Sequence, residues 1–271
     1  MADGPNGLFR QVIVVALPGL GAGAQPDAVD YHDRGASTLE HVSRYVGGLE
    51  LTNLAWLGLG NVIPNGAVTP ARPPAASVAR AARATAGREI QGGLEELVGP
   101  AIRALVADGV EVHGIGGAAH AFLDVPGVDP HEVGAHEALL EAVTAVMHRH
   151  PRGVVVASPD PGRGLTGSGP VGVARALTRF DAGLTALLDQ LDEQALLVIV
   201  GLGGNDATIA TRNGGGLTRE YAPVIAYSSS LPSGVDLGTR LTLADVGATA
   251  ADVFGAAAST PGKSFLGELL A

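Results

Sequence analysis

Ionisable residues follow the apolar runs of this sequence, where they could carry acid–base chemistry. Asp160 and Arg163 lie in the stretch SPDPGRG, which begins at the end of the run GVVVAS. Asn205 and Asp206 follow the run ALLVIVG, and His120 follows the run GVEVHGIG. A histidine beside a carboxylate can donate and remove protons near neutral pH. We therefore predict that Asp160, Asp206 and His120 are catalytic residues. Arg163 and Asn205 are predicted to bind the substrate.

The apolar runs predict strands that would bring these residues together. We expect strands over 11–17, 109–116, 153–158, 195–201 and 222–227, and helices over about 37–46, 94–108, 171–191 and 243–254. Strands that alternate with helices are typical of a parallel sheet covered on both faces. Ligands bind beyond the carboxyl ends of such strands. The candidate residues should therefore converge at one edge of the sheet.

Two further regions receive less specific predictions. The section from 61 to 91 is rich in Pro and Ala and is expected to be irregular. A helix is expected near 130–150, with His131, His136, His148 and His150 as surface residues on or beside it. His113 lies inside a predicted strand, where we interpret it as a histidine satisfied within the sheet.

Composition excludes several classes of protein. The 271 residues carry a net charge of −10, which argues against nucleic-acid and membrane-surface partners. The absence of cysteine excludes disulfides, thiolate metal sites and a cysteine nucleophile. No apolar run approaches the roughly 20 residues of a membrane span, and the first residues do not resemble a secretory signal, so we expect a cytoplasmic protein. Lys263 is the only lysine, a bias typical of GC-rich genomes such as those of actinomycetes.

Three stretches resemble phosphopentomutase, a member of the alkaline phosphatase superfamily that interconverts ribose 1-phosphate and ribose 5-phosphate. They are VIVVALPGLGAGAQPDAVDYHDRGASTLEHV with LTNLAWLGLGN, then HGIGGAAHAF, and finally GLTREYAPVIAYSSS with LADVGATAADVFG and GKSFL. The resemblance implies an α/β fold in which a mostly parallel sheet lies between helices, the alkaline-phosphatase-like core. Residues 1–271 would form a single core domain.

The resemblance also implies that this sequence has lost the family's metal ligands and its phosphate-carrying threonine. The family binds two divalent metal ions and relays phosphate through a threonine. The positions that match its metal ligands are Pro18, the run Leu202-Gly203-Gly204, and Leu217 preceded by Gly216. Ile90 lies at the position that matches the threonine. Hard cations need several carboxylate or imidazole ligands, and only Asp160 could match one. We therefore expect a metal-independent protein with no bound metal and no cofactor.

The family inserts a cap domain after a segment that matches GLEE here. In this sequence the following helix and strand, AIRALVADGVEVHGIG, come almost directly afterwards, so no inserted cap domain is expected. Arg88 and Gln91 lie at the positions around the family's threonine, and Arg219 belongs to the shared TREY motif. We predict all three as substrate-binding residues, and for Arg219 a purely structural role stays open.

Three functions remain open. The first is a repurposed metal-independent enzyme, a cyclase, dehydratase or isomerase that tailors a small-molecule intermediate in specialised, antibiotic-type metabolism. The second is a catalytically dead pseudoenzyme that binds a biosynthetic protein partner. The third is residual phosphopentomutase or phosphatase activity. A homo-oligomer is compatible with any of these functions.

Overall fold

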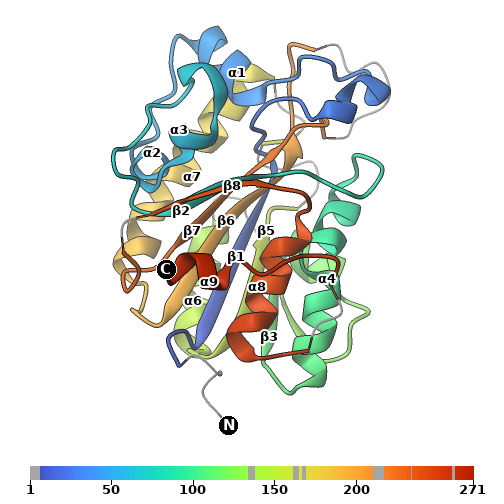
Figure 1. Ribbon diagram of the computed structural model, residues 1–271, viewed down its shortest axis with the longest axis vertical. Helices are drawn as coiled ribbons and strands as arrows, with labels where there is room; N and C mark the ends of the chain where they lie inside the picture. Colours follow the sequence, from blue (N-terminus) through green and yellow to red (C-terminus); the bar gives the residue numbers. More distant parts are fainter. Residues whose placement is uncertain are drawn as a thin grey trace.

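The computed structural model describes residues 7–133, 138–160, 165–166, 169–209, 217–232, 234–257 and 260–271. Their strands form one eight-stranded sheet in the order β4-β3-β5-β1-β6-β7-β2-β8 (Figure 1). The strands are β1 (Gln11–Gly19), β2 (Ser77–Ala81), β3 (Val112–Gly116), β4 (Val128–His131), β5 (Gly153–Ser158), β6 (Ala195–Gly204), β7 (Ala222–Tyr227) and β8 (Asp236–Arg240). Only β7 runs antiparallel to its neighbours, β6 and β2, so the sheet is mostly parallel.

Helices cover both faces of this sheet. They are η1 (Pro26–Tyr31), α1 (Thr38–Val46), α2 (Thr52–Leu57), α3 (Leu59–Val62), η2 (Pro64–Gly66), α4 (Ile90–Ala107), α5 (Gly117–Ala121), α6 (Leu139–Arg149), α7 (Pro170–Asp189), α8 (Ala244–Phe254) and α9 (Leu266–Leu269). Helices α4 and α8 lie side by side on one face, while α2, α3 and α7 lie on the other (Figure 1). The predicted layered α/β core is confirmed.

The burial of strand β1 shows why helices must pack on both faces of the sheet. All nine of its residues are buried. Its side chains alternate, so Val12 and Val14 join the core under α4 and α8, while Ile13 and Val15 join the core under α6 and α7. A strand that is apolar on both faces is stable only between two helical layers. This arrangement fixes the carboxyl ends of β1, β5 and β6 side by side.

All five predicted strands are present, but three more were missed. Strand β2 lies within the section expected to be irregular, where it pairs with β7 and β8. The helix expected near 130–150 is wrong at its start, because β4 ends at His131 and α6 begins at Leu139. The three missed strands, β2, β4 and β8, are short, so pairing with neighbours rather than local sequence stabilises them.

No cap domain is inserted at the predicted point. Helix α4 runs without a break from Ile90 to Ala107, and residues 108–111 connect it to β3. Across the described ranges, no helix is both long enough and apolar enough to span a membrane.

A buried carboxylate stabilises the join between α4 and α8. Glu96 on α4 accepts hydrogen bonds from the backbone nitrogens of Ala84, Thr85 and Leu243 and from the hydroxyls of Thr85 and Thr242, at 2.6 to 3.0 Å. Burial alone would raise the pKa of Glu96, but these hydrogen bonds outweigh it, so the pKa is lowered. Ionised Glu96 therefore holds three segments together.

We expect Glu96→Gln to destabilise the fold at pH 7 by about 1–3 kcal/mol, because the amide nitrogen cannot accept from buried donors. A depressed pKa contributes stability above the unfolded value of about 4.3, and this stability is lost as the pH falls through the lower folded value. The variant should therefore lose less stability than the parent between pH 7 and pH 3. Denaturant unfolding at both pH values measures this, and equal midpoints at pH 7 would contradict it.

Candidate functional site

His120 and Asp160 form a pair at the carboxyl end of the sheet. His120 lies on α5, which follows β3, and Asp160 lies two residues beyond β5. The His120 Nδ1 atom is 3.3 Å from Asp160 Oδ1, and its Nε2 atom is 3.5 Å from Glu132 Oε1. Asp160 Oδ1 is buried and has no hydrogen-bond partner in the part of the chain that the structure describes, whereas the His120 side chain is 48% exposed. A solvent-accessible imidazole between two carboxylates can carry a proton in either direction.

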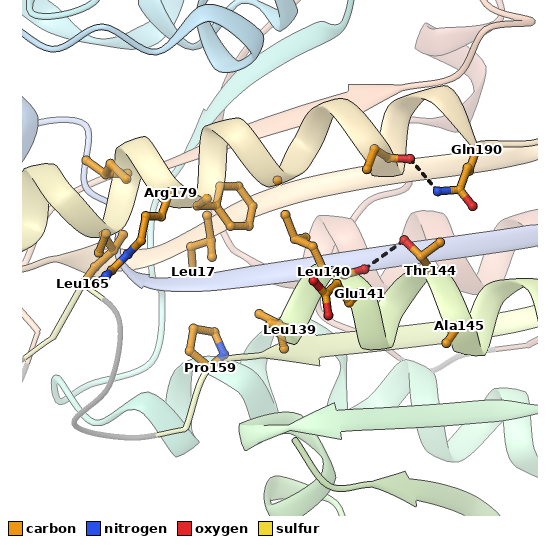
Figure 2. A pocket seen from close by; sticks show the side chains of 15 residues that line it. Leu17, Leu139, Leu140, Glu141, Thr144, Ala145, Pro159, Leu165, Arg179 and Gln190 are labelled. Carbon is orange, nitrogen blue, oxygen red and sulfur yellow. Dashed lines mark hydrogen bonds between the residues drawn. The ribbon is translucent and has the colours of Figure 1, made fainter. Parts of the chain in front are cut away.

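A cavity of about 550 Å³ lies between α6 and α7 (Figure 2). Leu17 of β1, Leu140 of α6 and Leu177 of α7 give it an apolar lining. Arg179 reaches toward Leu165 at one end, while Gln190 and Thr144 lie toward the other. The volume falls in the range of small-molecule sites, and an apolar wall with few polar groups is typical of them.

The lining of the cavity and the histidine pair are neighbours in the chain, although neither His120 nor Asp160 is a lining residue. Pro159 lines the cavity, and the next residue is Asp160. Leu165 lies at the same end, where its carbonyl accepts a hydrogen bond from Asn205 Nδ2. One end of the cavity therefore lies beside the predicted catalytic edge of the sheet.

Asp206 lies at this edge but is only 2% exposed. Its Oδ2 atom accepts from the Ser37 backbone at 2.9 Å and lies 2.6 Å from His41 Nδ1, and its Oδ1 atom accepts from the Thr208 hydroxyl at 2.6 Å. Burial would raise its pKa, but the bonds from Thr208, Ser37 and His41 outweigh burial and lower it. Both oxygens are occupied, so we interpret Asp206 as the anchor of α1. His41 was not singled out by the sequence.

The remaining predicted binding residues lie in internal contacts. Arg219 is 4% exposed, stacks 4.8 Å from the Tyr31 ring centroid and binds Asp27 at 2.8 Å. Arg88 lies 3.3 Å from Asp33, and the Gln91 amide donates to the Ala121 carbonyl at 2.9 Å. Arg163 lies outside the described residues. These contacts favour the structural role for Arg219.

The positions that match the family's metal ligands do not fit a pair of cations. Leu202 and Leu217 are buried and apolar, and Pro18 within β1 offers no ligating side chain. Around Leu202, Leu217 and Arg88, the described residues leave no space wide enough for a water molecule. We derive no catalytic step through metal ions at this place.

A buried glutamate, Glu220, lies beside the positions that match the family's metal site. Glu220 is 1% exposed and accepts hydrogen bonds from the backbone and hydroxyl of Thr38, the hydroxyl of Thr218 and the backbone of Gly23, at 2.6 to 3.2 Å. Burial raises its pKa, and the charge of Asp206 acts in the same direction. A Cβ atom at Gly204 would overlap its carboxylate, so glycine is required there. Glu220 and its hydrogen-bond partners therefore fill the space beside these positions.

A histidine cluster that the sequence did not predict lies on the α6 face of the sheet. His113 Nδ1 is 3.1 Å from His131 Nε2, and the His113 and His150 ring centroids are 4.0 Å apart. Burial and the neighbouring His150 and His131 lower the pKa of His113. The parallel register pairs His113 with Asp129 and Ile115 with His131, which brings the two strands' histidines together. Because β4 was not predicted from the sequence, this contact could not be predicted either.

The chain is similar to phosphopentomutases over nearly its whole length. It is 26% identical to the phosphopentomutase of Symbiobacterium thermophilum over 391 aligned positions, which cover 96% of this chain and 98% of the relative. Because this chain has 271 residues, more than a hundred of those positions are gaps here. A shorter match to the Deinococcus radiodurans phosphopentomutase is 46% identical over 100 residues, 37% of this chain and 25% of the relative. These gaps agree with the missing cap.

Two further comparisons agree with the fold. Residues 163–258 match the family model described as Metalloenzyme superfamily. A protein in the alkaline phosphatase superfamily from Vibrio parahaemolyticus superposes with a TM-score of 0.59 at 14% identity, covering 94% of this chain and 69% of that one. The chain thus has the alkaline-phosphatase-superfamily fold and a phosphopentomutase-like sequence.

Proposed function

We propose that this phosphopentomutase-like protein of the alkaline phosphatase superfamily is a metal-independent enzyme that performs acid–base chemistry on a small organic molecule. His120 and Asp160 are the proton-transferring pair. The observation that carries the proposal is the 3.3 Å approach of His120 to Asp160 beside the cavity that Pro159 lines. The altered metal positions argue for a new reaction rather than a weakened old one.

The cavity lining defines the class of substrate. Leucine side chains from β1, α6 and α7 favour a mainly hydrocarbon skeleton. Arg179 and Glu141 also line the cavity, so its wall contains one basic and one acidic side chain. A phosphosugar is a poor fit to these walls, because its many polar groups would be desolvated without enough partners.

The reaction class follows from the pair itself. Proton removal from carbon by His120, followed by return of that proton to another atom of the same molecule, gives an isomerisation. Return of the proton to a departing hydroxyl gives a dehydration, with water as the product. Attack of the resulting carbanion on a carbonyl carbon of the same molecule, with return of the proton to the carbonyl oxygen, gives a cyclisation. None of these steps needs an oxidant or a metal ion. The compositional bias supports a setting in specialised, antibiotic-type metabolism of a GC-rich bacterium.

Deletion of the gene, followed by mass spectrometry of small molecules from the host, tests this proposal. We expect one intermediate to accumulate, and its mass to identify the substrate. A wild-type copy should remove the intermediate, whereas a folded copy with His120→Gln and Asp160→Asn should not. Full rescue by the double variant would contradict the enzyme proposal.

One observation favours a second function. The region that matches the family's metal site has no room for a water molecule among the described residues, as expected of a pseudoenzyme that binds a protein partner. In that case the double variant would rescue fully, and a biosynthetic protein would co-purify with both the variant and the parent. The deletion experiment therefore separates the two functions.

A further inference from the structure

The histidine cluster is built around a buried nitrogen that has no hydrogen-bond partner among the described residues. The His113 side chain is 4% exposed, and this nitrogen is its Nε2 atom. If His113 Nδ1 donates to His131 Nε2 across their 3.1 Å contact, Nε2 carries a lone pair rather than a proton. A buried acceptor without a donor is costly, so its surroundings need an explanation.

The atoms nearest to this lone pair are further ligands. Glu111 Oε2 lies 3.8 Å from His113 Nε2 and 3.5 Å from His150 Nδ1. One ligand atom from each of Glu111, His113 and His150 lies within 4.8 Å of the other two. A carboxylate that faces an imidazole nitrogen is stabilised by a positive charge between them, carried either by a proton or by a metal ion. Tetrahedral Zn²⁺ with ligands at about 2.1 Å would space neighbouring ligand atoms by roughly 3.4 Å, and the two distances from Glu111 Oε2 to the imidazole nitrogens, 3.8 and 3.5 Å, are close to this spacing.

The supporting contacts resemble those around metal-bound histidines. A metal-bound histidine usually donates the N–H of its second ring nitrogen to a fixed acceptor, and His131 Nε2, 3.1 Å from His113 Nδ1, is placed to accept it. The buried Gln11 side chain donates to the carbonyls of Met147 and His150, which holds the end of α6 in position. Glu111 is 58% exposed, so a water molecule can complete the coordination.

We propose that His113 Nε2, His150 Nδ1 and Glu111 bind a divalent transition-metal ion such as Zn²⁺. Two imidazoles and a carboxylate favour Zn²⁺ over Mg²⁺ or Ca²⁺, which prefer oxygen ligands. The site ties β3 to the end of α6, near the amino ends of the strands and away from the His120 pair. A second set, His113 Nδ1 with Asp129 and His131, shares the central histidine but uses the nitrogen that already has a partner.

Equilibrium dialysis of the full-length protein against Zn²⁺ tests the site, and the absorption spectrum of bound Co²⁺ reports its ligand geometry. We expect one equivalent of either ion and a tetrahedral Co²⁺ spectrum. His150→Ala and Glu111→Gln should each weaken Zn²⁺ binding by more than about 100-fold, and His131→Asn by about 10- to 100-fold. His148→Ala, an exposed histidine on the same helix, should leave binding unchanged.

The variants keep the proposal testable because Glu111 and His150 are accessible to solvent and are not expected to be needed for folding. Absence of Zn²⁺ binding by the parent would overturn the proposal, since the cluster would then hold only protons. Loss of binding in His131→Asn and Asp129→Asn, with full binding in His150→Ala, would also overturn it. Equal losses in His148→Ala would indicate adsorption to surface histidines.

Discussion

Substitution of His120 by glutamine should reduce turnover of the accumulated intermediate by roughly 10²- to 10⁴-fold, the usual contribution of a general acid or base. Glutamine preserves much of the side chain's size and hydrogen bonding but does not exchange a proton near neutral pH. His120 is 48% exposed, so the variant should retain the parent's thermal midpoint. The measurement is conversion of the purified intermediate by equal amounts of the two folded proteins.

The matched control is His148→Gln, because His148 is also exposed but lies on α6 toward the opposite end of the sheet. Its turnover should equal that of the parent. Asp160→Asn should lower turnover as well, since a neutral amide stabilises the protonated imidazole less. Parent-like turnover by His120→Gln would show that another residue moves the proton.

Filling the cavity should abolish function by a different route. Gly183 lies in the middle of α7 and lines the cavity, and a Cβ atom there would approach Leu140 Cδ1 at 3.0 Å. Leucine at this position would extend across the space between α7 and α6. Because glycine is a poor helix former, Gly183→Leu should not weaken α7 itself. We expect loss of rescue in the deletion host and loss of turnover by the folded variant.

Ala182→Leu is the control for this prediction. Ala182 precedes Gly183 on α7, is exposed and does not line the cavity. The control should rescue the deletion host fully. If Gly183→Leu also rescues fully, with an unfolding midpoint near that of the parent, the substrate does not bind between α6 and α7.

The sequence predicts the centre of this sheet well because its strands are buried on both faces. Runs such as QVIVVAL have no stable place other than between two helical layers, so β1, β5, β6 and β7 could be located. Strand β2, with the sequence SVARA, has no such signature. It is a strand because β7 and β8 offer their backbone groups to it, and this pairing depends on residues far away in the chain.

Some features of the candidate site could likewise be predicted from the sequence, and others could not. Proximity of His120 to Asp160 follows from parallel strands that end at one edge, and the structure brings the two together. Burial of Asp206 and Arg219 depends on α1 and on η1, whose packing no short motif reports. The histidine cluster depends on the register of β4 against β3. The cavity depends on how α6 and α7 diverge, which only the assembled layers reveal.

The most direct test of metal-independent acid–base chemistry is turnover of the accumulated intermediate by chelator-treated protein. The assay should use both the parent and His150→Ala, because the variant lacks the proposed Zn²⁺ site and removes that ion from the comparison. We expect the same rate before and after treatment with EDTA, and no increase on addition of Mn²⁺. Turnover that disappears with EDTA and returns with Mn²⁺ in the His150→Ala protein would contradict metal-independent acid–base chemistry.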